Sequence, residues 1–343
     1  MSQRSKRKEE HLALAKMFFN KQIPSDFDNI HLIRPALPER KYEPQSISTQ
    51  MFGKKIAAPI YINAMTGGSK QSFRINKVLG QASAKAKIPM ALGSASILEK
   101  EPEQLESFYI ARQENPDGLL FANINPNTSP KIAKNIVNTL NADALQIHLN
   151  TIQEAAMPEG DREFYWLDNL KAIKEIIDVP IIIKEVGQGL DKPSILLLEK
   201  EGFTNFDLGG SGGTDFAKIE NSRRSHPDLS FLEDINLSTP KTLLWLNQAK
   251  YQQVSGKLFA SGGIRNSLDI FKCLVLGANF VGMASHFLDF AYRGTDELTN
   301  EIENIKNQLV MLTALFGLSD LSQAPKVKYY LDNNLFTFLK QIK

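Results

Sequence analysis

Short apolar segments rich in β-branched and aromatic residues recur along the chain, and each is followed by polar or glycine-rich residues. Such runs, bounded by glycine and polar clusters, are typical of buried strands. Between them, apolar positions recur at helical spacing, and Trp166, Leu170, Ile173 and Ile177 share one face of a predicted helix. The predicted strands are PIYIN (59–63), PMALG (89–93), LLFAN (119–123), ALQIH (144–148), PIIIK (180–184), FDLGG (206–210), LFASGG (258–263) and FVGMAS (280–285).

The order of these elements predicts the fold. Strands that alternate with helices form a parallel sheet, and eight evenly distributed units predict an α/β fold with a single closed (β/α)8 TIM barrel. A doubly wound open sheet is the alternative, although it suits eight even units less well. Residues 1–58 then form an N-terminal helical extension with a basic arm, and residues 59–343 form the barrel with a C-terminal helix and tail.

The composition excludes several classes of protein. A chain of 343 residues with 42% hydrophobic and 23% charged residues can bury a full core. Its net charge of +2 does not favour nucleic acid, and five histidines with one cysteine exclude a disulfide framework or a cysteine-rich metal site. Neither a signal peptide nor a membrane-spanning segment is recognisable, so we expect a cytoplasmic protein without a membrane partner.

Polar residues follow the predicted strands, and the fourth strand shows why. Active sites of TIM barrels lie at the C-terminal ends of the strands, so the residues after each strand should line the site. On the fourth strand Gln146, His148 and Asn150 share one face, whereas Leu145 and Ile147 share the other. The polar face should therefore form a wall of a binding site in the barrel mouth.

Three glycine-rich loops follow the last three strands: GGSGGT (209–214), SGGIR (261–265) and GMAS (282–285). Glycine lets the backbone approach an anion closely, and the later loops of these barrels commonly bind phosphate. The hydroxyl groups of Ser211 and Thr214 add possible donors. One such loop would be a tight turn as readily as a site, but three at adjacent positions indicate a phosphate-bearing cofactor.

Two charged residues in the mouth have competing interpretations. Lys184 ends the fifth strand, where a buried cation needs an anion or an electron-rich ring beside it; the alternative is a structural ion pair with Glu185 or another carboxylate. Glu154 could hold magnesium together with ligand oxygens, or it could be a solvent-exposed glutamate at a helix start. A basic cluster near the N-terminus could clamp a diphosphate or be a solvated arm. It comprises Arg4, Lys6, Arg7 and Lys8.

Familiar catalytic patterns are missing from the sequence. No serine–histidine–acid arrangement or GxSxG motif is recognisable, and the other histidines lack metal-ligand spacing. Cys273 lies in an apolar helical segment and should be part of the core. His148 is therefore the strongest titratable candidate, and a cofactor should supply the chemistry.

Several of these segments together resemble one family, the type 2 isopentenyl-diphosphate isomerases. RKEEHL (7–12) is similar to the N-terminal signature of that family, and QIHLNTIQEAAMPEGDR (146–162) is very specific to it. The resemblance covers essentially the whole chain. The other segments that carry it are AMTGGS, ALGSAS, FANI, VPIIIKEVGQG, DLGGSGGTDFAKIENSR and ASGGIRNSLDIFKCLVLGA.

The resemblance implies an FMN enzyme that interconverts isopentenyl diphosphate and dimethylallyl diphosphate in isoprenoid biosynthesis. It implies reduced FMN, Mg²⁺ and NADPH as cofactors, and a homo-oligomer, since the family forms tetramers and octamers. The residues then expected to contact flavin are Ala64, Met65, Thr66, Ser94, Asn123, Lys184, Ser211 and Thr214, with the FMN phosphate against Gly262, Gly263, Arg265, Ala284 and Ser285.

The same resemblance assigns the substrate side of the site. Arg7, Lys8, His148, Asn150 and Gln153 are expected to bind the diphosphate substrate, and Glu154 is expected to hold Mg²⁺. One departure stands out, because some members carry an arginine in the loop after the second strand, where this chain has GSASILEK (93–100).

The implied chemistry is proton addition and elimination with reduced FMN as acid and base. The expected catalytic residues are Lys184, which would favour the anionic reduced flavin, Gln153, which would orient the alkene or the flavin, and His148. Two alternatives remain at this point: an FMN-dependent dehydrogenase or oxidase with His148 as its base, and a non-catalytic flavin-binding barrel.

Overall fold

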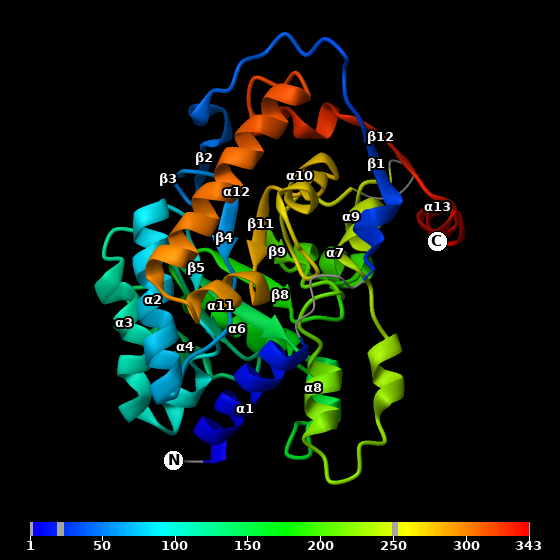
Figure 1. Ribbon diagram of the computed structural model, residues 1–343. Helices are drawn as coiled ribbons and strands as arrows, with labels where there is room; N and C mark the ends of the chain where they lie inside the picture. Colours follow the sequence, from blue (N-terminus) through cyan, green and yellow to red (C-terminus); the bar gives the residue numbers. More distant parts are fainter. Residues whose placement is uncertain (1–2, 19–23, 249–252, 343) are drawn as a thin grey trace.

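The computed structural model describes residues 3–18, 24–248 and 253–342. Eight parallel strands close into a barrel in the order β10-β11-β4-β5-β6-β7-β8-β9, visible at the centre of Figure 1. All eight predicted strands and the closed barrel are confirmed, and the open sheet is excluded. The strands are β4 (Ile60–Ile62), β5 (Met90–Ala91), β6 (Leu120–Ile124), β7 (Ala144–Leu149), β8 (Ile181–Glu185), β9 (Asn205–Asp207), β10 (Lys257–Ser261) and β11 (Phe280–Met283).

Helices surround the barrel, as the alternating pattern predicted. Several begin at a residue whose side chain accepts a hydrogen bond from the first turn, such as Ser69, Asp191 and Asn266. Short helices also follow β7, β9 and β11 at the mouth. The helices are α2 (Lys70–Ala86), α3 (Glu106–Glu114), α4 (Pro130–Thr139), α5 (Thr151–Ala156), α6 (Leu167–Ile176), α7 (Lys192–Lys200), α8 (Phe216–Ser222), α9 (Thr239–Leu246), α10 (Ser267–Val275), α11 (Ser285–Ala291) and α12 (Thr295–Leu315).

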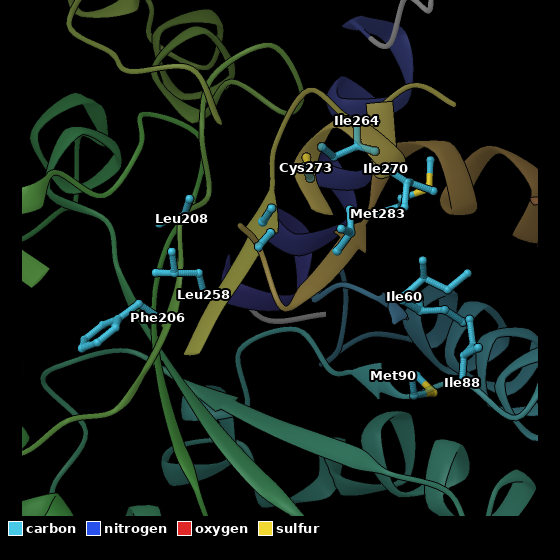
Figure 2. Close-up of a cluster of buried hydrophobic side chains, with 14 of the residues drawn as sticks. Ile60, Ile88, Met90, Phe206, Leu208, Leu258, Ile264, Ile270, Cys273 and Met283 are labelled. Carbon is cyan, nitrogen blue, oxygen red and sulfur yellow. The ribbon is translucent and has the colours of Figure 1, made fainter. Parts of the chain in front are cut away.

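The apolar residues form two main layers. The larger layer lies between the strands and the helices, and Figure 2 shows part of it, including Cys273, whose burial confirms its assignment to the core. A second cluster fills the inside of the barrel with Tyr61, Phe121 and Phe259. The hairpin that joins β2 (Thr49–Met51) to β3 (Lys54–Ile56) adds Phe52 to this cluster. The barrel is therefore packed at its N-terminal end.

The N-terminal residues contact both the barrel mouth and the C-terminal part of the chain. Helix α1 (Gln3–Phe18) contacts α8 and α11 at the barrel mouth (Figure 1). Strand β1 (Ile30–Ile33) pairs antiparallel with β12 (Lys328–Leu331), which precedes α13 (Asn333–Gln341). The side chain of Arg4, part of the predicted basic cluster, lies outside the described residues. Among the helices of the described ranges, none combines the length and the apolar character that crossing a membrane requires.

Candidate active site

A cavity of about 530 Å³ lies at the C-terminal ends of the strands, and residues after all eight strands line it. This is the location that the barrel fold predicts for an active site. Of the predicted site residues, only Ser211 is not part of its lining. Those that line it are Arg7, Lys8, Ala64, Met65, Thr66, Ser94, Asn123, His148, Asn150, Gln153, Glu154, Lys184, Thr214, Gly262, Gly263, Arg265, Ala284 and Ser285.

The backbone of Ser211 is paired with another segment, whereas its neighbours Gly210 and Gly212 line the cavity. Its N–H donates to the carbonyl of Leu237 at 2.9 Å, and it forms an isolated bridge with Ser238. The pairing holds Ser211 against the segment that precedes α9. Thr214, in contrast, reaches the cavity, where its hydroxyl lies 2.8 Å from that of Ser285.

The glycine loops form a surface without side chains. Gly262 has φ +92°, and a Cβ there would lie 1.8 Å from the carbonyl oxygen of Gly210. A Cβ on Gly213 would lie 2.9 Å from the backbone nitrogen of Gly263. Backbone therefore packs directly on backbone between the loops after β9 and β10. The chain offers here the cradle of peptide groups that anions such as phosphate occupy.

Arg265 lines the same end of the cavity, but its guanidinium is bound by carboxylates. Its Nη2 lies 2.6 Å from Oδ1 of Asp28, and its Nε lies 2.8 Å from Oδ2 of Asp269. Hydrogen bonds to these two carboxylates raise the pKa of Arg265 above its ordinary value. The arginine thus ties the short helix Asp26–Asn29 to the glycine loop, and its predicted contact with phosphate stays a prediction.

Lys184 is 5% exposed on the floor of the cavity. Its Nζ donates to the carbonyl of Glu185 at 2.8 Å and lies 3.9 Å from Oδ2 of Asp207. The carboxylate of Glu185 instead accepts hydrogen bonds from the four backbone N–H groups of residues 186–189. Burial raises the pKa of Glu185. The carboxylate that pairs with Lys184 is therefore Asp207, which the sequence analysis did not identify although it is an acid inside an apolar strand.

His148 is held by an amide chain on the cavity wall. Nδ2 of Asn123 donates to Oε1 of Gln146 at 3.3 Å, so Oδ1 of Asn123 faces Nδ1 of His148 at 2.7 Å and accepts a hydrogen bond from it. Burial, with the positive charges of Lys184 and Lys8, lowers the pKa of His148 from 6.5 to about 3. The imidazole is therefore neutral near pH 7, with Nε2 as its acceptor nitrogen.

Helix α5 carries the polar residues that follow β7. Nδ2 of Asn150 donates to Oε1 of Gln153 at 3.1 Å and to Oε1 of Glu154 at 3.0 Å. Oε2 of Glu154 accepts the N–H of Asp161 at 2.8 Å. Each oxygen of Glu154 thus retains a lone pair for a cation. Within the described part of the chain no three acidic, histidine or cysteine side chains gather into a metal site, so magnesium would depend on ligand oxygens as well.

Helix α1 covers one side of the cavity. Nζ of Lys8 donates to the carbonyl of Ser94 at 2.8 Å, and Nη1 of Arg7 lies 3.2 Å from Oε1 of Glu159. Leu12 is buried. His11 also lines the cavity, with Nε2 2.9 Å from Oε1 of Glu220. The sequence analysis missed His11, because nothing in a helical pattern predicts which residue across the fold a polar side chain meets.

The loop that lacks an arginine is held by Ser96. Its hydroxyl lies 2.8 Å from that of Thr128 and accepts the N–H of Asn125 at 2.9 Å. Lys100, at the end of the same segment, lines the cavity. The loops after β5 and β6 are therefore joined through neutral groups.

Comparisons with known proteins show which class of protein the chain belongs to. The family model described as FMN-dependent dehydrogenase matches residues 112–329. Among solved structures, a flavocytochrome b2 variant with sulfite bound covers 97% of this chain and 84% of its own, with a TM-score of 0.68 and 18% identity. A mandelate oxidase variant with benzoyl-formic acid covers 94% and 90%, with a TM-score of 0.62 and 13% identity. Fold and family model together define an FMN-dependent type of (β/α)8 barrel.

Two curated relatives show which family within this class the chain belongs to. The isopentenyl-diphosphate delta-isomerase of Latilactobacillus sakei subsp. sakei (strain 23K) is 39% identical over 338 residues, which cover 98% of this chain and 96% of the relative. The protein of the same name from Staphylococcus haemolyticus (strain JCSC1435) is 39% identical over 345 residues, or 99% and 97% of the two chains. The chain belongs to the isopentenyl-diphosphate delta-isomerase family, which confirms the resemblance.

Proposed function

We propose that this chain interconverts isopentenyl diphosphate and dimethylallyl diphosphate with FMN bound in the barrel mouth. One observation carries the proposal. A single cavity has a glycine cradle at Gly262 and Gly263 on one side, and on the other side the basic and amide groups of Lys8, His148 and Gln153. Two separate phosphate-bearing molecules fit such a site better than one, because anion-binding groups lie on both sides.

The residues on the glycine side fit FMN. The phosphate would lie against Gly262, Gly263, Ala284, Ser285 and Thr214, where backbone approaches backbone without intervening side chains. The isoalloxazine ring would lie over the floor formed by residues 64–66, Ser94, Asn123 and Lys184. When bound and reduced by NADPH, FMN supplies the proton and the electron-rich surface that alkene protonation requires.

The chain's own residues bind and orient the substrate. Arg7 and Lys8 bring positive charge from α1 to the substrate side of the cavity, and Glu154 would hold Mg²⁺ on the diphosphate. Gln153 lies beside Asn150 and orients the alkene through its amide. An anion next to His148 favours the charged imidazole, so diphosphate binding should be accompanied by proton uptake.

We also propose a homo-oligomer, a tetramer or an octamer, that acts in isoprenoid biosynthesis in the cytoplasm. Support for self-association comes from exposed apolar side chains around β1, β12 and α13. Ile33, Tyr330 and Phe336 are 52%, 57% and 48% exposed. Because β1 pairs with β12 and α13 contacts β12, these side chains lie near one another, and exposed apolar side chains that gather in this way commonly mark interfaces.

The test is turnover under anaerobic conditions in D₂O. The protein receives FMN, dithionite or NADPH, Mg²⁺ and isopentenyl diphosphate, and NMR follows the products. We expect deuterated dimethylallyl diphosphate without NADPH consumption beyond flavin reduction. Flavin that is bound and reduced while the diphosphate stays unchanged would contradict the proposal and favour an FMN-dependent oxidoreductase. Lys184→Gln should lose most of the activity, and full activity in that variant would remove the role assigned to Lys184.

A further inference from the structure

Asp207 is a fully buried acid at the end of β9. Its neighbours Phe206 and Leu208 pack in the apolar layer outside the barrel (Figure 2), so by strand alternation Asp207 points inside. There it accepts hydrogen bonds from the hydroxyl of Tyr61 at 2.6 Å and from that of Ser261 at 2.5 Å. Nδ2 of Asn63 donates to it at 3.3 Å. All three donors are neutral.

The charge of Asp207 is compensated by Lys184, whose Nζ lies 3.9 Å from Oδ2. Both side chains are buried, so the attraction acts where water does not screen it. Asp207 does not line the cavity, whereas Lys184 does. The acid therefore lies behind the lysine as seen from the site.

Tyr61 keeps this arrangement in place. Its pKa is raised well above its ordinary value by burial and by the charge of Asp207, so the phenol remains a donor. The ring is confined because a Cβ on Gly282 would lie 2.4 Å from it. The carboxylate is thus held by donors on β4 and β10, and it has little freedom to turn away from Lys184.

We propose that Asp207 is a positioning residue, which holds the ammonium group of Lys184 in place on the cavity floor. This inference rests on the proposed function, since it assigns Asp207 a part in that reaction without contact to substrate or cofactor. Lys184 has three N–H donors, of which one serves the carbonyl of Glu185. The opposing carboxylate restrains the ammonium group, so that a remaining donor is available to a ligand.

The first test uses the protein without added FMN. Asp207→Asn, Lys184→Gln and the double variant are compared by thermal unfolding. Each single variant should unfold several degrees lower, because it leaves the other buried charge unpaired. The double variant should lose clearly less than the sum of the two. Losses that simply add would overturn the pairing.

The second test uses the FMN-loaded enzyme with isopentenyl diphosphate and Mg²⁺. Asp207→Asn should lower kcat at least about tenfold and change KM less than about twofold. In the Lys184→Gln background it should cause no further loss of kcat. The absorption spectrum of bound FMN should also shift in Asp207→Asn, because the charge near the ring changes.

Asp143→Asn is the matched control. Asp143 is another acid of the barrel, bound to Arg112 and Lys54 just before β7, at the opposite end of the strands. Its variant should lose stability and keep both the FMN spectrum and kcat. The proposal fails if Asp207→Asn behaves like this control.

A second variant covers the case in which Asp207→Asn does not fold. Tyr61→Phe removes one donor to Asp207, and it should lower kcat in the native background but not in the Lys184→Gln background. If the wild-type protein itself does not convert isopentenyl diphosphate, the proposed function fails, whereas the unfolding cycle and the FMN spectra still decide the pairing of Asp207 with Lys184.

Discussion

His148 shows how strongly neighbours determine the chemistry of a single residue. Its Nδ1 is bound to the amide oxygen of Asn123, and burial, together with the charges of Lys184 and Lys8, lowers its pKa from 6.5 to about 3. In the unfolded chain the imidazole takes up a proton near pH 6.5. Stability that the neutral ring contributes above pH 6.5 is therefore lost as the pH falls from 6.5 toward 3.

Replacing His148 by Asn removes this acid-sensitive contribution. Relative to the wild type, the free energy of unfolding of His148→Asn should rise by up to about 2 kcal/mol between pH 7.5 and pH 5, since each pH unit below 6.5 is worth at most about 1.4 kcal/mol. Urea unfolding of both proteins at the two pH values measures this change. An equal difference at both pH values would show that His148 titrates normally in the folded protein.

Gly262 is the second position at which a single residue decides the site. With φ +92° and only 1.8 Å between a would-be Cβ and the carbonyl oxygen of Gly210, any side chain forces the two loops apart. Gly262→Ala should weaken FMN binding more than about tenfold, because a displacement of this backbone removes aligned peptide groups from the phosphate.

A matched control exists in Gly53. Its φ is +79°, but no atom lies within 4 Å of a would-be Cβ. Gly53→Ala should cost about 1 kcal/mol of stability through strain alone and leave FMN affinity unchanged. Titration of both apoproteins with FMN separates the two effects, and comparable affinity losses would contradict the role of the close approach.

At the scale of elements, α1 is attached to the barrel by few apolar contacts. Leu12 is buried, whereas Met17 on the same helix is 66% exposed. Burial of one leucine is worth about 2–5 kcal/mol against alanine, which is enough to determine whether a short helix stays docked. The ion pairs that Arg7 and Glu10 of α1 form with Glu159 and Arg223 are partly exposed, and such ion pairs contribute little.

Leu12→Ala should therefore release α1 without unfolding the barrel. We expect amide exchange in residues 3–18 to accelerate at least about tenfold, while the main thermal midpoint moves by less than about 2 °C. The KM for isopentenyl diphosphate should rise. Met17→Ala is the control and should change none of these quantities. A lowered main midpoint in Leu12→Ala would show that α1 unfolds together with the barrel.

At the scale of the whole molecule, one end of the barrel forms the site and the other end stabilises the fold. The C-terminal end holds the cavity, whereas the N-terminal end is closed by apolar packing and by Arg112. This arginine is 5% exposed. It donates to the carbonyls of Asn115, Pro116, Gly118 and Asn141 and pairs with Asp143 at 2.7 Å.

Arg112→Met tests this division. The variant leaves buried carbonyl groups without a donor and weakens the pairing of Asp143, so the free energy of unfolding should fall by about 3–5 kcal/mol. At 25 °C, kcat and KM should stay within about twofold of the wild type, because the opposite end is untouched. Denaturant unfolding and steady-state kinetics measure the two effects. A large loss of kcat in folded protein would show that the ends are coupled.

The strands and the location of the site were predictable because each depends on a local pattern. The alternation of β7 assigned His148 and Asn150 to the mouth, and both line the cavity. The glycine loops after the last strands were also recognisable from the local sequence, without knowledge of the residues that they contact. Pairings across the fold were not predictable in this way: the backbone of Ser211 pairs with residues 237 and 238, and its neighbours along the chain do not reveal that pairing.

By itself, the sequence determined the eight units, their closure into a barrel, and the end at which polar groups gather. These depend on periodicity and on the backbone freedom of glycine, which act over a few residues. Only the tertiary structure decided that Arg265 binds Asp28, that Lys184 pairs with Asp207 rather than with adjacent Glu185, and that α1 covers the mouth. Such pairings join residues on different elements, and a pattern along one element indicates which face is buried but not what lies opposite.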